Sequence, residues 1–131
     1  MPALNFQERW SDAVQIGASH ANGVFMSIGT VLPKRTTIRK WGRIWIGQRL
    51  YLYTGQRTAK CRKLGEVICL SATPFTISEN GVSRLGEYAL NQAEIEHLAR
   101  LDTAGQLSGP EFIDFFRSAY GLPFDGGLYG W

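Results

Sequence analysis

Apolar and polar residues alternate with the period of β-strands through the middle of this chain, and they recur with the period of an α-helix near its two ends. Runs rich in branched and aromatic residues, with polar residues interleaved, are typical of half-buried strands. An Asn-Gly pair at 80–81 predicts the turn of a two-stranded ribbon. The predicted strands cover residues 3–6, 36–41, 48–53, 64–72, 75–78, 85–90 and 128–131.

Helical spacing appears first in residues 7–16, where Trp10 and Val14 share one face at positions i and i+4. Gly17 is predicted to end this helix, because glycine readily adopts the backbone conformation of a helix terminus. Residues 17–33 carry several glycines, a proline and the apolar patch 24–26, which predicts a long loop or a lid.

Two further helices are predicted toward the C-terminus. Asn91-Gln-Ala-Glu94 and Ser108-Gly-Pro-Glu111 both place an acid three residues after a capping side chain, as a capping box requires. Gly121 is predicted to close the second of these helices. Short strands followed by helices indicate an α+β domain built on a small, closed or half-closed β-sheet.

Composition limits the class of protein. Apolar residues make up 44% and charged residues 19% of 131 residues, which predicts one globular domain spanning 1–131. With no secretory signal, Cys61 and Cys69 are predicted to be reduced thiols in a cytoplasmic protein. These two cysteines and the separate His20 and His97 match no zinc spacing, so we expect no metal and no cofactor. No apolar run approaches the ~20 residues of a membrane span.

Positive charge is concentrated in one stretch. Ten of the fourteen Lys and Arg residues lie between Lys34 and Lys63, and that stretch contains no Asp or Glu. A positive surface without internal counter-charges favours a phosphate backbone as partner, which predicts RNA or nucleotide binding.

Residues 34–39 begin this basic stretch and carry its candidate chemistry. Side chains alternate along a strand, so Thr37 and Arg39 face a groove if Ile38 faces the core. Lys34 can fold back toward the same groove. The neighbouring cations are either a solvated rim or phosphate contacts, and they are Arg35, Lys40 and Arg43.

Aromatic residues lie among these cations. Bases stack on aromatic rings in single-strand binders, although aromatic residues on strands are more often part of a core. The candidates for such stacking are Trp41, Trp45, Tyr51 and Tyr53. Arg57 and its neighbouring cations either extend a phosphate track or form a charged surface turn.

Five segments, in this order, resemble a known family. They are Phe6-Gln7-Glu8-Arg9-Trp10, Lys34-x-x-Thr37-Ile38-Arg39, the run 47–55, the run 57–65, and Phe124-x-Gly126-x-Leu128-x-x-Trp131. Together they resemble the ASCH domain, the activating-signal-cointegrator homology domain, in its bacterial and prophage branch. The resemblance implies a small β-barrel similar to the PUA domain, with two to three flanking helices.

The same resemblance implies a cleft for RNA, a nucleotide or a modified nucleoside. One enzymatic branch hydrolyses the amide of N4-acetylcytidine with a Lys, a Thr and a Glu. By position these correspond to Lys34, Thr37 and Asp102, with a shorter acid in this chain.

Three functions stay open at this point. A threonine hydroxyl needs a nearby base, and a lysine serves as one only when burial and neighbouring cations lower its pKa from ~10.4. Without such a shift, Lys34 and Thr37 would bind nucleic acid without turnover. A third alternative is an accessory protein whose Val24-Phe25-Met26 loop contacts a protein partner.

Overall fold

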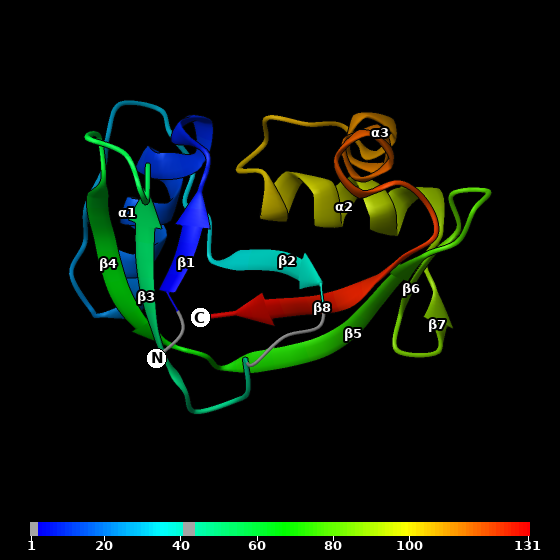
Figure 1. Cartoon of the computed structure of the whole chain (residues 1–131), viewed down its shortest axis with the longest axis horizontal. Coiled ribbons are helices and arrows are strands. Elements are labelled where there is room, and N and C mark those ends of the chain that lie inside the picture. The colour runs from blue at the N-terminus through cyan, green and yellow to red at the C-terminus, as the bar shows by residue number, and fades with distance from the viewer. Residues whose placement is uncertain (1–2, 41–43) are drawn as a thin grey trace.

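A computed structural model gives the fold and describes residues 3–40 and 44–131. This part of the chain forms three α-helices, a short 3-10 turn and two β-sheets (Figure 1). The strands are β1 (Ala3–Phe6), β2 (Thr36–Lys40), β3 (Arg49–Thr54), β4 (Arg62–Ile68), β5 (Ser71–Ile77), β6 (Ser83–Leu85), β7 (Tyr88–Ala89) and β8 (Phe124–Gly130). The helices are η1 (Glu8–Trp10), α1 (Ser11–Ala21), α2 (Gln92–Asp102) and α3 (Gly109–Tyr120).

The strands are divided between the two sheets. One sheet has the order β1-β3-β4, with β1 parallel to β3 and β4 antiparallel to it. The other has the order β2-β8-β5-β6-β7 and is antiparallel throughout. The predicted α+β class is confirmed, and the strands of the described ranges do not form a closed barrel.

Each sheet packs against its own helices, and the buried apolar residues form two clusters. In Figure 1, α1 lies against the three-stranded sheet, while α2 and α3 lie over the five-stranded sheet. The first core contains Val14, Leu50 and Leu52, and the second contains Phe75, Phe112 and Phe116. Burial of these large apolar side chains, at roughly 1.5–3 kcal/mol each, fixes how the helices seat on the sheets.

The predicted single strand over residues 64–72 is wrong, because the chain leaves one sheet there and enters the other. β4 ends at Ile68 and β5 begins at Ser71. Between them, Cys69 N–H donates to the O of Gln48, the residue just before β3, and Leu70 N–H donates to Gly130 O of the second sheet. An unbroken run of β-favouring residues does not reveal such a change of sheet. The predicted strand 85–90 is likewise divided at Gly86 into β6 and β7.

The first helix also differs from its prediction. It begins as η1, continues as α1 to Ala21, and passes through Gly17 instead of ending there. A Cβ on Gly17 would lie 1.9 Å from Lys34 O, so this glycine permits close packing of the helix on the backbone at Lys34. Lys34 N–H donates to Ala13 O at 2.8 Å, which attaches the start of β2 to α1.

The predicted caps are confirmed. Asn91 and Glu94 form a reciprocal capping box at α2, and Ser108 and Glu111 form one at α3. Gly121 ends α3 with a φ of 76°. Across residues 3–40 and 44–131, no helix combines the length and apolar character needed to cross a bilayer.

Candidate functional site

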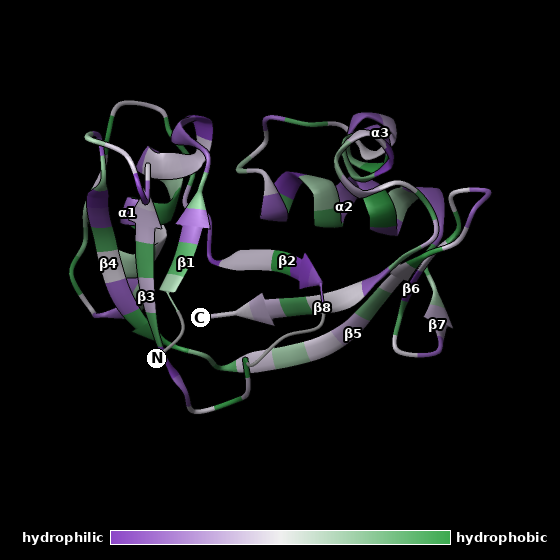
Figure 2. Ribbon diagram, in the orientation of Figure 1, coloured by the Kyte–Doolittle hydropathy of each residue, from purple (hydrophilic) through white to green (hydrophobic). Residues whose placement is uncertain are grey.

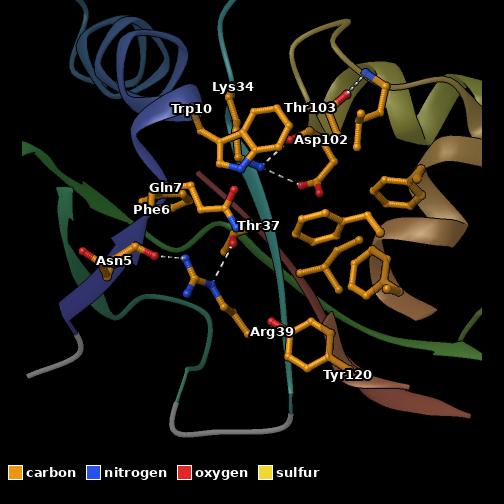
Figure 3. Close-up of a pocket in the computed structure, with 15 residues that line it drawn as sticks. Asn5, Phe6, Gln7, Trp10, Lys34, Thr37, Arg39, Asp102, Thr103 and Tyr120 are labelled. Carbon is orange, nitrogen blue, oxygen red and sulfur yellow. Dashed lines mark hydrogen bonds and ion pairs between the residues drawn. The ribbon is translucent and has the colours of Figure 1, made fainter. Parts of the chain in front are cut away.

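A cavity of about 130 Å³ lies where β1, β2, the end of α2 and the inner side of α3 meet (Figure 3). It is smaller than the roughly 300–1,000 Å³ of sites for drug-sized ligands, so it suits a single ring or an acyl group. The residues that line it are Asn5, Phe6, Gln7, Trp10, Lys34, Thr37, Ile38, Arg39, Asp102, Thr103, Leu107, Phe112, Phe115, Phe116 and Tyr120.

Lys34 and Asp102 form a buried ion pair at one end of this cavity. Lys34 Nζ lies 3.0 Å from Asp102 Oδ1, and both side chains are less than a tenth exposed. Nζ also donates to Asp102 O and, at 2.6 Å, to Thr36 O. All three ammonium donors therefore have partners. Asp102 reaches the pair because α2 ends there and its last residue faces β2.

Opposing influences act on the pKa of Lys34. Burial lowers it below its ordinary value of 10.5, because removal from water disfavours the charged form. The Asp102 carboxylate opposes that shift, and the positive charge of Arg39 adds slightly to it. The balance lies below the ordinary pKa, which is the direction that general-base chemistry requires.

Arg39 and Thr37 form the second polar group of the cavity. Arg39 Nε donates to Thr37 Oγ1 at 2.9 Å, and Arg39 Nη2 donates to Asn5 O at 2.9 Å. The guanidinium carbon lies 4.8 Å from the centre of the Phe6 ring. Arg39 therefore joins β2 to β1 and holds the Thr37 oxygen in a fixed position. Within the described residues, no hydrogen bond links Thr37 Oγ1 to Lys34 Nζ.

The electrostatic surroundings of Arg39 differ from those of a surface arginine. Burial lowers its pKa below the ordinary value of an arginine, and the nearby Tyr120 and Asp102 oppose that shift. An arginine stays protonated even with such a shift, so the cavity holds one permanent positive charge beside the Lys34–Asp102 pair.

Aromatic side chains supply the remaining walls. Figure 3 shows Trp10 above the ion pair and Tyr120 at the opposite end, beside Arg39. Tyr120 is 43% exposed, so its ring forms part of the cavity mouth. Lys40 Nζ lies 5.6 Å from the centre of that ring, which places an exposed cation at the same mouth.

The predicted site residues fall into two groups. Lys34, Thr37, Arg39 and Asp102 meet at the cavity. The alternation of side chains along a strand predicted this place for Thr37 and Arg39, whereas the family resemblance suggested Asp102. Figure 2 shows this strand changing from near-neutral threonines to a strongly hydrophilic tip.

The other predicted contacts do not line the cavity. Arg35 is exposed and its Nε donates to Trp131 O at 2.7 Å. Arg57 is exposed in the turn after β3, and Tyr53 is half-buried on β3. Arg57 and Tyr53 lie apart from the cavity because β3 belongs to the three-stranded sheet, whereas β2 belongs to the five-stranded one. Trp41 lies outside the described residues.

Residues 17–33 were predicted to form a long loop or a lid, but 17–21 belong to α1 and none of the residues 17–33 lines the cavity. Phe25 is 86% exposed and stacks on His20, with ring centres 5.3 Å apart. Of the two free cysteines, Cys61 is exposed and Cys69 is buried. Among the described residues, no group of three or more His, Cys, Asp or Glu could hold a metal ion.

Sequence reasoning missed Thr36, Trp10 and Tyr120. Thr36 Oγ1 donates to Asp102 Oδ1 at 2.7 Å, so this carboxylate accepts hydrogen bonds from two side chains. Alternation along the strand places Thr36 on the same side as Ile38, the side expected to face the core, and only the approach of α2 converts that side of β2 into part of the site. No spacing signal connects Trp10 or Tyr120 to residues 34–39.

Neither models of protein families, nor curated proteins, nor solved structures give a match to this chain.

Proposed function

We propose that this chain is an ASCH-like domain of PUA-like architecture whose cavity binds a base of RNA or a nucleotide. One observation carries the proposal. Lys34, Thr37, Arg39 and Asp102, separated by up to 68 positions, line a single small cavity with aromatic walls. A polar floor with a fixed cation and a ring-sized space suits a heterocyclic base.

The surroundings of the cavity support the same ligand class. Lys40 lies exposed at the mouth, next to Tyr120, where a phosphate attached to a bound nucleotide would emerge. The basic stretch 34–63 has no acidic residue of its own, although Asp102, Glu66 and Glu8 pair with some of its cations. The other cations of the stretch that the structure describes have no acidic partner within ion-pair distance, and such cations attract phosphate over a distance of about 10 Å at ordinary salt.

Salt dependence tests this binding function. A fluorescent single-stranded RNA titrated with protein at several salt concentrations should show affinity falling steeply as salt rises. Lys40→Ala should reduce the slope of log affinity against log salt by about one. Arg84→Ala, an exposed cation on β6, is the matched control and should leave the slope unchanged. Absence of binding at low salt, or binding indifferent to salt, would contradict the proposal.

A second candidate, hydrolysis of the amide of N4-acetylcytidine or a related acylated nucleoside, is favoured by the lowered pKa of Lys34. In this reaction Thr37 Oγ1 attacks the acyl carbon and its proton passes to the neutral Lys34 amine. The C–N bond then breaks as Lys34 returns that proton to the leaving amine, and water hydrolyses the acyl ester. Arg39 would stabilise the developing oxyanion.

The two polar groups must shift for this chemistry. Lys34 Nζ donates to Asp102 and Thr36, whereas Thr37 Oγ1 accepts from Arg39. A bound substrate would have to draw Lys34 toward Thr37, and hydrogen bonds at catalytic sites often tighten only in the complex.

Chromatography of N4-acetylcytidine incubated with the protein tests the second candidate directly. Wild-type protein should release cytidine, and Thr37→Val should reduce the rate at least ~100-fold because the nucleophile is lost while the side-chain shape is kept. Arg84→Ala should keep the wild-type rate. No cytidine from the wild-type protein would remove this candidate and leave the binding function standing.

A further inference from the structure

One edge of strand β2 pairs with β8, and the other edge is free. The register of the pairing with β8 shows which backbone groups of β2 point toward the free edge. Trp131 N–H donates to Arg35 O, and these two residues lie opposite one another at the end of the ladder. In an antiparallel pair, hydrogen-bonded and non-bonded positions alternate. The backbone groups of Thr37 and Arg39 therefore bond to β8, while those of Thr36 and Ile38 point to the opposite side.

Two independent contacts agree with this alternation. Lys34 Nζ donates to Thr36 O, so that carbonyl lies on the side away from β8. Gly130, which lies opposite Thr36, has its carbonyl turned toward Leu70 N–H instead of β2. The N–H and C=O of Ile38 consequently lie on the open edge.

The cavity lies over this edge. Its lining includes Thr37 and Arg39 from one face of β2, and Phe112 and Phe116, which share a core with Ile38, from the other. A cavity can reach both faces of a strand only across an unpaired edge, and the other edge of β2 is covered by β8. Figure 3 shows β2 crossing the centre of the site with side chains directed to both sides.

The open edge is too short for a peptide strand. Thr36 O is occupied by Lys34, and neither Thr36 nor Lys40 lines the cavity, so Ile38 is the described cavity-lining residue of β2 whose N–H and C=O lie on the open edge with no partner among the described contacts. Strand addition needs several consecutive main-chain bonds. One donor beside one acceptor instead complements the edge of a heterocyclic base, and about 130 Å³ favours one ring over two.

We propose that the ligand is a pyrimidine whose donor-and-acceptor edge pairs with the main-chain N–H and C=O of Ile38. This inference rests on the proposed nucleic-acid function and assigns how the base is read. Arg39, held by Asn5 and Thr37, supplies positive charge beside the ring. Because the base would be recognised by backbone groups, the residue type at position 38 does not indicate this contact. The Ile38 side chain itself is apolar and packs in the core.

Backbone-assigned NMR spectra of the full chain test this pairing. Cytidine and uridine are titrated, and the better ligand is compared with its edge-methylated form, N4,N4-dimethylcytidine or 3-methyluridine. The 5-methyl form of the same nucleoside is the control, because it adds volume while leaving the edge intact. The Ile38 amide proton should move downfield on binding, with smaller changes at Thr37. Loss of the edge donor should weaken binding roughly tenfold.

Hydrogen exchange of the free protein gives a second readout that needs no ligand. The Ile38 amide should exchange faster than the amides of Thr37 and Arg39, which bond to β8. Equal protection at all three positions would overturn the assignment of the open edge.

The ligand outcomes separate the two proposals. Binding with an unmoved Ile38 amide and no penalty for edge methylation would overturn the pairing while leaving the nucleic-acid function intact. If neither the nucleosides nor single-stranded RNA bind at millimolar concentration, both proposals fail.

Discussion

Replacing Asp102 by asparagine should destabilise the protein severely, although the two side chains are nearly the same size. The substitution removes the charge partner of the Lys34 ammonium, which is only 5% exposed. Breaking a buried ion pair by removing one partner costs about 3–5 kcal/mol. The carbonyls of Thr36 and Asp102 still hold the ammonium, so we expect the lower end, about 3 kcal/mol. With a urea m-value of ~2 kcal/mol/M, the unfolding midpoint should fall by about 1.5 M.

A double-mutant cycle separates the interaction energy of the ion pair from the other effects that each substitution has on stability. Lys34→Met should also cost about 3 kcal/mol, because it leaves the Asp102 carboxylate buried with one hydroxyl donor. The double variant Lys34→Met/Asp102→Asn should lose less free energy of unfolding than the two single variants lose in total, and the difference, the coupling energy, should be about 2–3 kcal/mol. Asp114→Asn, at an exposed pair on α3, is the control and should change little.

Two results would refute this reasoning. If Asp102→Asn unfolds at the wild-type urea concentration, the carboxylate does not stabilise the buried ammonium. If the two single effects add, the groups do not interact energetically in the folded protein. Circular dichroism and tryptophan fluorescence should give coincident unfolding curves, which justifies the two-state free energies used in the cycle.

Three other predictions follow from burial. Because the pKa of Lys34 is lowered in the folded state, the unfolded chain binds more protons in the interval below 10.5. The stability of the wild type relative to Lys34→Met should therefore increase as the pH rises toward 10.5. Thermal melts in which this stability difference decreases with rising pH would contradict the prediction. A thiol reagent should modify the exposed Cys61 in the native protein and the buried Cys69 only after unfolding, since burial also raises the pKa of Cys69. Mass spectrometry that finds both cysteines labelled in the native protein would contradict this expectation. Gly17→Ala should cost about 1–3 kcal/mol in urea unfolding, because its Cβ would collide with Lys34 O, whereas the exposed Asp12→Ala on the same helix should be nearly neutral.

The sequence was sufficient to predict features that depend only on residues close to one another along the chain. The capping boxes at Asn91 and Ser108 were predicted because a cap depends on residues within one helical turn. The groove-facing pair Thr37 and Arg39 was predicted because side chains alternate on any strand. Residue spacing on its own therefore determined the α+β class and half of the polar site.

Tertiary structure decided what local spacing does not encode. The chain changes sheets between Ile68 and Ser71 because Gln48 and Gly130 offer hydrogen-bond partners there, and both are distant in sequence. Gly17 lies within a helix because close packing against Lys34, not chain termination, is its role.

The site itself shows the same division. The resemblance located Asp102, but only the docking of α2 on β2 made it the partner of both Lys34 and Thr36. The residue types of the cavity were set by the sequence. Their burial, and with it the lowered pKa of Lys34, came from helices and strands that meet only in the folded chain, because desolvation depends on everything that surrounds a group.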